Sequence, residues 1–106
     1  RGYLPGTNEM ALGRDVMKRP LFVQTCRAGD GLKVPGSRGR RSVKRLCADR
    51  GIGPGERDTL PAFYVGESLA AVWPLGVDEE FQPRETDGER IIIQIKREIA
   101  GGYSNG

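Results

Sequence analysis

Glycine and proline recur throughout this chain, and we therefore expect its helices and strands to be short. The longest unbroken apolar run is Leu69–Trp73, in a chain of 106 residues with 16 glycines and 7 prolines. A membrane-spanning helix needs about 18 or more apolar residues in a row, which excludes a membrane protein. Glycine and proline together stay below the ~25–30% typical of low-complexity chains, and 37% of the residues are hydrophobic. We therefore expect one small domain with many turns.

The two parts of the chain differ in charge. Residues 1–60 carry 13 basic and 6 acidic side chains, whereas residues 61–106 carry 4 basic and 8 acidic ones. This asymmetry favours a surface in the first part that faces a polyanion, and the alternative is a domain whose charges are placed at random. The N-terminal residues contain no apolar segment of the kind that directs secretion, so we expect a cytoplasmic location.

The absence of certain residue types limits which catalytic and metal-binding sites this chain can form. The chain has no histidine, which removes the usual general base near neutral pH and the commonest metal ligand. Its two cysteines, Cys26 and Cys47, form no CxxC pair, so a structural zinc site is excluded. We expect two reduced, mostly buried thiols rather than a disulfide. The carboxylates at 78–80 form either a divalent-cation site or, as we expect, an ordinary surface loop. We therefore expect neither enzyme activity nor a cofactor in this chain alone.

The clearest predicted element is a helix in the middle of the chain. Ser42 is a suitable N-cap, and Gly51 follows an end at Asp49 or Arg50. Three residues at helical spacing form its apolar stripe: Val43, Leu46 and Cys47.

Short apolar runs bounded by turn residues predict the other elements. They are strands over 21–26 and 32–34 that form one hairpin, strands over 62–65 and 68–73 that form a second, a short helix that opens at Pro54, and a last strand over 91–95. Residues 1–20 are expected to form an extended arm or linker with a helical turn around Glu9–Leu12, and residues 101–106 a flexible tail. The prediction is an α+β domain over residues 21–100, with a small mixed sheet, one longer helix and one shorter helix.

Five cations lie within the eight residues Arg38–Arg45. They are Arg38, Arg40, Arg41, Lys44 and Arg45. Arginine is suited to bidentate phosphate contacts, and the free N–H groups at a helix start favour an anion. The alternative is a solvated helix face, since Arg41 and Arg45 are expected to point away from the apolar stripe.

The aromatic residues do not accompany these cations. Phe63, Tyr64 and Trp73 fall in predicted strands and are expected in the core, rather than on a platform that stacks bases. The sequence therefore favours recognition of the backbone and shape of a folded nucleic acid over sequence readout.

Five short motifs follow one another in the middle of the chain. They are Arg27-x-Gly29-Asp30, then Pro35-Gly36, then Gly39-Arg40-Arg41-Ser42-Val43-Lys44-Arg45-Leu46, then Gly51-Ile52-x-Pro54-x-x-Arg57-Asp58-x-Leu60-Pro61, and last Val72 with Gly76-Val77. Taken together, over about residues 21–81, this order resembles the C-terminal domain of the tRNA(Ile)-lysidine synthetase (TilS) family.

The resemblance implies a fold and a role. The fold is a small architecture of helices and strands shared with part of the phenylalanyl-tRNA synthetase β chain, called PheT/TilS-like. The role is to grip the acceptor stem of a tRNA, while a separate ATP- and magnesium-dependent domain of the parent ligase attaches lysine to an anticodon cytidine. The family's basic positions fall on Arg27, Arg40, Arg41, Lys44, Arg45 and Arg57. Of these, Arg27 and Arg57 either contact RNA or hold Asp30 and Asp58.

The same resemblance implies what this chain lacks and how the parent assembles. The ATP-binding Ser-Gly-Gly loop of the catalytic domain is absent, so this chain cannot perform the ligation alone. Its Gly51–Gly55 segment matches a phosphate loop only in glycine content, and a proline that opens a helix explains the segment better. A homodimer would form through the parent enzyme.

Two other functions stay open. One is a free-standing hydrolase that acts on misacylated tRNA, by analogy of fold. The other is a protein-interaction module that uses the acidic second part. A large pocket lined by polar side chains would favour the hydrolase, and a flat basic face would favour tRNA binding.

Overall fold

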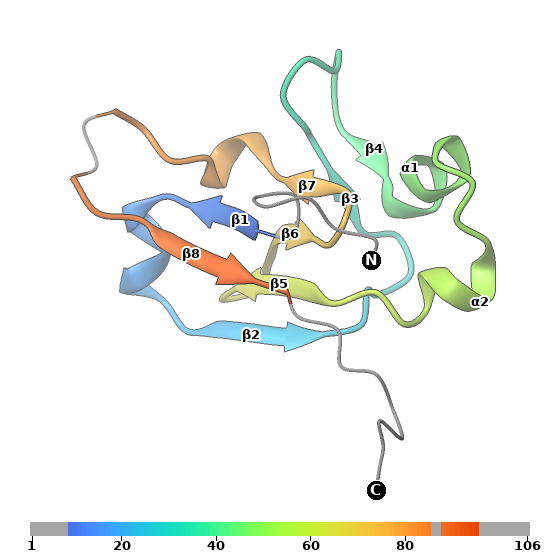
Figure 1. The fold of residues 1–106 in the computed structure, drawn as a ribbon, viewed down its shortest axis with the longest axis horizontal. Coiled ribbons are helices and arrows are strands. Elements are labelled where there is room, and N and C mark those ends of the chain that lie inside the picture. The colour runs from blue at the N-terminus through green and yellow to red at the C-terminus, as the bar shows by residue number, and fades with distance from the viewer. Residues whose placement is uncertain (1–8, 86–87, 96–106) are drawn as a thin grey trace, which may run out of the picture.

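The computed structural model describes residues 9–85 and 88–95 (Figure 1). The strands are β1 (Glu9–Leu12), β2 (Leu21–Gln24), β3 (Gly31–Leu32), β4 (Arg41–Ser42), β5 (Ala62–Val65), β6 (Ser68–Val72), β7 (Gly76–Val77) and β8 (Ile91–Gln94). The helices are α1 (Val43–Asp49), α2 (Pro54–Arg57) and the 3₁₀ helices η1 (Arg14–Lys18) and η2 (Glu79–Phe81). This confirms the α+β class with one longer and one shorter α-helix.

Strand β5 lies inside the largest sheet, whose order is β2-β5-β6-β7 with antiparallel neighbours. All four residues of β5 are buried. Successive side chains of a strand point to opposite faces. Phe63 and Val65 accordingly enter one hydrophobic core, and Ala62 and Tyr64 enter another. The sheet thus separates two cores, and the predicted core placement of Phe63, Tyr64 and Trp73 is confirmed.

The first core lies between this sheet and the two-stranded sheet of β1 and β8 (Figure 1). The register places Met10 opposite Ile93 and Leu12 opposite Ile91. These four side chains share the inward face, where they pack with Phe63 and its neighbours. The inward-facing side chains Ile91 and Ile93 of β8 therefore help to cover one face of the β2-β5-β6-β7 sheet.

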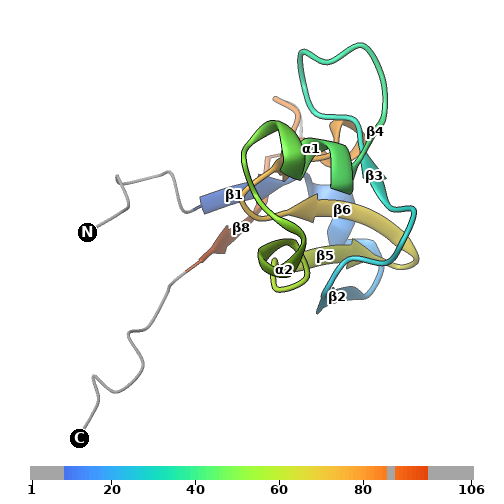
Figure 2. The same ribbon diagram turned by 90° about the vertical axis from the view of Figure 1, so that its right-hand side faces the viewer.

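Helix α1 covers the other face (Figure 2). Val43 and Cys47 are buried, and Leu46 is partly buried against the same second core, as the predicted stripe requires. The side chain of Ser42 caps the helix by accepting a hydrogen bond from the Arg45 backbone N–H at 3.0 Å. After the helix, Gly51 adopts φ +74°, a left-handed conformation that glycine enters at little cost. Both predicted ends of this helix are confirmed.

The β5–β6 hairpin contains a bulge that couples it to η2. The register shifts between Phe63 and Tyr64, which leaves Ala70 as the extra residue of β6. The Ala70 carbonyl accepts a hydrogen bond from the Asp78 N–H at 2.8 Å. The Asp78 carboxylate, 4% exposed, accepts from the backbone N–H groups of Lys33 at 2.7 Å and Glu80 at 3.0 Å. The expected surface loop at 78–80 is therefore a capped turn with a buried anchor.

Two predictions about the first part of the chain are wrong. Residues 9–12 form strand β1 rather than a helical turn, and Leu12 and Val16 are buried in the first core. Residues 9–20 therefore do not form the predicted arm. Their apolar residues matched neither helical nor strand spacing well in isolation, and the partner strand β8 lies about eighty residues away in the sequence. The remainder of the arm, 1–8, and the predicted tail, 101–106, lie outside the described residues.

The first predicted hairpin is also wrong. Strand β2 pairs with β5, while β3 pairs with β4. The turn at 27–30 leads the chain away from β2, and the Val43 N–H donates to the Asp30 carbonyl at 2.9 Å. The strands expected in one small mixed sheet therefore form three antiparallel sheets. Exposed apolar side chains remain on the edge strand β2: Leu21, Phe22 and Val23.

Two features are absent from the described residues. None of the helices within 9–85 and 88–95 is long and apolar enough to cross a membrane. Within the same ranges, no three residues of the metal-binding types His, Cys, Asp and Glu lie together as a candidate metal site. Cys26 is half-buried, Cys47 is buried, and both are free thiols.

We expect Cys47→Asp to lower the free energy of unfolding by several kcal/mol, because the new carboxylate would lie unpaired in the second core. Cys47 is 0% exposed. The control is Ala48→Asp, at an exposed position of the same helix, which should cost about 1 kcal/mol or less. Urea denaturation measures both. Equal losses, or fast thiol labelling of Cys47 in the native protein, would contradict the burial.

Candidate nucleic-acid interface

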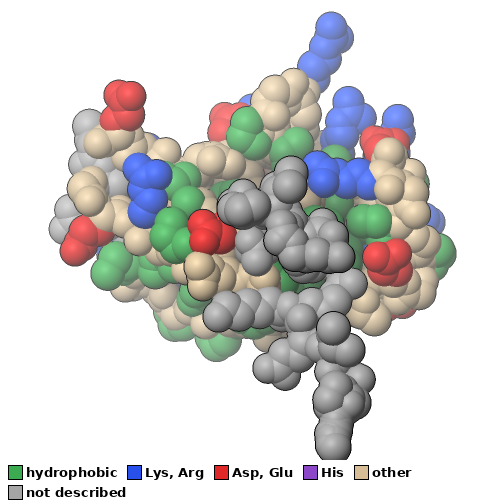
Figure 3. Space-filling view, in the orientation of Figure 1, with side chains coloured by type: hydrophobic (Ala, Val, Ile, Leu, Met, Phe, Trp, Pro, Cys, Tyr) green, Lys and Arg blue, Asp and Glu red, His purple; other side chains and the backbone are tan. Residues whose placement is uncertain are grey.

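The predicted basic run is spread over three elements rather than along one helix. Arg38 lies in the loop between β3 and β4, Arg41 lies in β4 opposite Leu32, and Lys44 and Arg45 lie in α1. The expectation that Arg41 projects from the helix is therefore corrected. In Figure 3, Lys and Arg side chains gather on the upper right of the molecule, over the region of β4 and α1.

Most of these cations are available to a ligand. Arg38, Arg41 and Lys44 are exposed, and no carboxylate of the described residues forms an ion pair with them. Arg45 pairs with Asp49 through an Nε–Oδ1 distance of 3.3 Å, with both side chains more than half exposed. Such exposed pairs contribute about 1 kcal/mol or less. A phosphate could therefore replace Asp49 as the partner of Arg45 at small cost.

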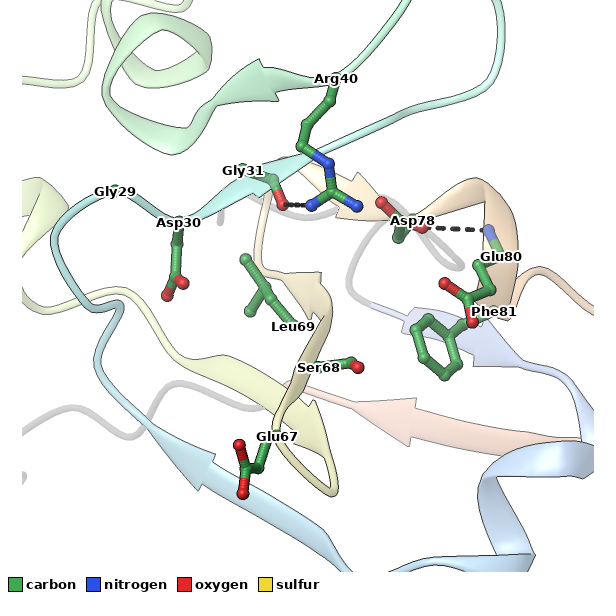
Figure 4. Close-up of a pocket in the computed structure, with 10 residues that line it drawn as sticks. All are labelled: Gly29, Asp30, Gly31, Arg40, Glu67, Ser68, Leu69, Asp78, Glu80 and Phe81. Carbon is green, nitrogen blue, oxygen red and sulfur yellow. Dashed lines mark hydrogen bonds between the residues drawn. The ribbon is translucent and has the colours of Figure 1, made fainter.

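Arg40 points elsewhere. Its guanidinium donates a hydrogen bond to the Gly31 carbonyl at 3.0 Å. It thereby lines a polar cavity of about 230 Å³ on the β3 side of the sheet (Figure 4). Four carboxylate residues line the same cavity: Asp30, Glu67, Asp78 and Glu80. Arg40 therefore lies at a cavity whose other charged lining residues are all acidic.

A second cavity, of about 360 Å³, collects three cations from separate segments. We call it the basic pocket. It is lined by Cys26, Arg27, Ala28, Gly29, Val43, Lys44, Arg57 and Asp58. Arg27 comes from the turn after β2, Lys44 from α1 and Arg57 from the end of α2. The basic side of the molecule is therefore not the flat face expected of a tRNA-binding surface.

Tyr64 holds the segment that carries Arg27. The guanidinium carbon of Arg27 lies 4.9 Å from the centroid of the Tyr64 ring, a cation–π contact. The Tyr64 hydroxyl donates to the Asp30 carboxylate and accepts from the Arg27 backbone N–H at 3.3 Å. The Asp30 carboxylate also accepts from the Arg27 N–H at 2.8 Å. The backbone N–H of Arg27 thus holds Asp30. The guanidinium of Arg27 does not take part in this contact, and it lies over the Tyr64 ring at the basic pocket.

Burial and the hydrogen bond to Asp30 both raise the pKa of Tyr64. Tyr64 is 1% exposed, and its burial, with the hydrogen bond to Asp30 as a second cause, raises its pKa to about 12. Sequence reasoning placed Tyr64 in the core but did not connect it with the basic residues. A buried tyrosine hydroxyl usually finds a partner, and this general rule was the signal that could have pointed to Asp30 or its neighbours.

Arg57 is held more loosely than Arg27. Its Nε lies 3.9 Å from the Asp58 carboxylate, beyond hydrogen-bonding distance, and the Asp58 side chain is 77% exposed. The Arg57 side chain itself is 26% exposed. Its two terminal nitrogens have no partner among the described residues. The sequence left open that Arg57 serves to hold Asp58. In the structure this contact is long and involves only Nε, so the rest of the guanidinium is left for a ligand.

A small α+β domain with a basic pocket is the class of protein that these observations define. Comparison with known families identifies it further: residues 21–93 match the model of the TilS substrate C-terminal domain. The chain belongs to this family, as the motif order in its sequence indicated.

Individual relatives agree with this assignment. A tRNA(Ile)-lysidine synthase of Symbiobacterium thermophilum is 31% identical over 96 residues, 89% of this chain. A bifunctional protein TilS/HprT of Listeria monocytogenes is 32% identical over 103 residues, 93% of this chain. A tRNA(Ile)-lysidine synthase of Pseudomonas aeruginosa is 39% identical over 83 residues, 77% of this chain. The matched part spans 20%, 15% and 18% of these relatives, so the chain corresponds to about a fifth of their length or less.

We expect the stability of the protein to fall between about pH 10 and 12 in a way that depends on Tyr64. An unfolded tyrosine has a pKa of about 10, whereas the folded value is about 12. The folded state therefore holds the Tyr64 proton more tightly, and the stability it confers is present below pH 10 and lost as the pH rises to 12. Urea denaturation across this range should show a smaller decline for Tyr64→Phe. Identical pH dependence of the two proteins would contradict the raised pKa.

Proposed function

We propose that this chain binds the acceptor stem of a tRNA as the C-terminal domain of a tRNA(Ile)-lysidine synthase. Membership of the TilS substrate C-terminal domain family supports a tRNA substrate. The names of the relatives support an enzyme that modifies tRNA(Ile).

The observation that carries the proposal is the basic pocket beside a set of available cations. Arg27, Lys44 and Arg57 converge on one cavity, and Arg38, Arg41 and Arg45 lie exposed on the neighbouring loop, strand and helix. Phosphates dominate the affinity of proteins for nucleic acids, and arginine and lysine supply the contacts. An A-form duplex is recognised mainly through its phosphates, its 2′-hydroxyls and its shape. These side chains would therefore fix the position of a stem without reading its sequence.

The chemistry of the parent enzyme would take place elsewhere. ATP and magnesium would be held by a catalytic domain outside this chain, which would act as a ligase. Gly51–Gly55 does not fit an ATP-phosphate loop, because it lacks the Lys-Ser/Thr ending and the first residue of α2 is Pro54, which has no backbone N–H for a phosphate. The contribution of this chain is to bind and orient the tRNA. Assembly of the parent as a homodimer and its location in the cytoplasm belong to the same proposal. The domain includes β1, because Met10 and Leu12 of this strand lie in the first core.

The hydrolase alternative lacks a nucleophile with a base. Ser68 is the hydroxyl residue that lines the polar cavity, and no carboxylate of the described residues accepts a hydrogen bond from it. The basic pocket, of about 360 Å³, is large enough for a small-molecule site. The described residues that line it include no hydroxyl side chain, and burial raises the pKa of its Cys26 thiol to about 11, so it supplies no thiolate at pH 7. We therefore retain tRNA binding as the proposed function.

We expect the double variant Arg41→Ala, Arg45→Ala to bind an acceptor-stem RNA hairpin more weakly at low salt. Each phosphate contact contributes about 0.7–0.9 to the slope of log K against log salt, so the slope should flatten by about one to two units. Fluorescence anisotropy at several salt concentrations measures this slope. Both side chains are exposed, so circular dichroism should show an unchanged fold.

The matched control is Arg90→Ala, which removes a cation of the same type. Arg90 is exposed and immediately precedes β8, whose start lies at the opposite end of the molecule from α1 (Figure 1). Its loss should leave the salt slope almost unchanged. If the double variant keeps the slope of the wild-type protein, the cations of β4 and α1 form only a solvated surface.

A further inference from the structure

We propose that the basic pocket binds the terminal 5′-phosphate of the acceptor stem, a phosphate monoester, rather than a phosphodiester within the strand. This inference rests on the proposed function and names the part of the tRNA that the basic pocket would receive. The shape of the pocket is the first argument. Its volume of about 360 Å³ falls in the ~300–1,000 Å³ range usual for small-molecule sites, which is enough for a terminal nucleotide's phosphate and sugar. A continuous backbone passes over such a cavity, whereas the end of a strand can enter it.

The charge of the pocket is the second argument. Its lining holds Arg27, Lys44 and Arg57 against a single carboxylate, Asp58. That carboxylate is largely exposed and lies 3.9 Å from Arg57, so solvent screens it. A monoester carries a charge of about −1.5 to −2 at pH 7, with three strong acceptor oxygens, and a diester carries less. A surplus of two positive charges therefore matches the monoester better.

The rigidity of Arg27 and of the turn that carries it is the third argument. Arg27 is stacked on the Tyr64 ring, and its backbone N–H is held by the Asp30 carboxylate. The turn that follows is closed by the Asp30 N–H, which donates to the Arg27 carbonyl at 3.1 Å, and it is joined to α1 through Val43. Gly29 takes φ +87° in this turn, a conformation that other residues rarely adopt. Because these groups are held before a ligand arrives, binding costs them little conformational entropy.

The remaining lining fits the nucleotide that bears the phosphate. Beside the cations the pocket is lined by the Cys26 thiol, the apolar Ala28 and the largely buried Val43, which suits contact with the carbon atoms of a ribose. Burial, with the nearby Asp30 charge as a second cause, raises the pKa of Cys26 to about 11. Its thiol is therefore neutral at pH 7 and does not repel an anion.

The experiment compares two RNA hairpins of one acceptor-stem sequence, one with a 5′-monophosphate and one with a 5′-hydroxyl. Both are titrated into the full 106-residue chain. Hydrogen bonds to charged groups are strong enough that we expect about tenfold tighter binding of the phosphorylated hairpin. Lys44→Met keeps the length of an exposed side chain and should remove most of this preference. Arg57→Met should act in the same direction.

Arg38→Ala is the matched control, because this residue lies in the β3–β4 loop and does not line the pocket. It should weaken binding of both hairpins by the same factor and leave their ratio unchanged. A preference for the phosphorylated hairpin that survives in both Lys44→Met and Arg57→Met would overturn the pocket as its site.

The other outcomes separate this proposal from the proposed function. Equal binding of the two hairpins would overturn the 5′-phosphate inference and leave acceptor-stem binding intact. No binding of either hairpin at low salt would overturn both. Inorganic phosphate provides a further arm: if it binds to the chain as tightly as the phosphorylated hairpin does, the pocket is a site for the free anion and the inference fails.

Discussion

Strand β5 sends a side chain into one core or the other at each of its four positions, so both faces of the central sheet must be covered. The sheet of β1 and β8 covers the face of Phe63 and Val65, and α1 with its flanking strands covers the face of Ala62 and Tyr64. Burying a large apolar side chain stabilises the fold by about 1.5–3 kcal/mol. Because its helices and strands are short, this chain is stabilised by packing one layer of elements on each face of the sheet that contains the β5–β6 hairpin.

Tyr64 connects this core with the surface. Its ring belongs to the second core, yet its hydroxyl bonds to Asp30 and its face supports the guanidinium of Arg27. Helix α1 makes a similar connection, because Cys47 packs inside while Lys44 reaches the basic pocket. The part of the pocket formed by Arg27 and its turn is thus fixed by a residue of the core. A site on rigid elements keeps its donors in place more accurately than one on free loops.

Local patterns predicted the elements whose signals lie within a few residues. Ser42 and Gly51 gave the ends of α1, Pro54 gave the start of α2, and the apolar runs around Gly66 gave the β5–β6 hairpin. The same reasoning failed for β1, for the partner of β2 and for the position of Arg41. These depend on pairing between distant segments, and strand partners are chosen by burial of shared faces rather than by the strand's own residues.

The sequence by itself determined the α+β class, the family, the longer helix with its apolar stripe and an excess of cations in the first part of the chain. Each of these follows from residue order or from short-range spacing. Only the tertiary structure decided that Arg27, Lys44 and Arg57 line one pocket while Arg40 lies among carboxylates in another. The physical reason is that a cation's neighbours are set by how the elements pack, and the elements that meet at the basic pocket are separated along the chain.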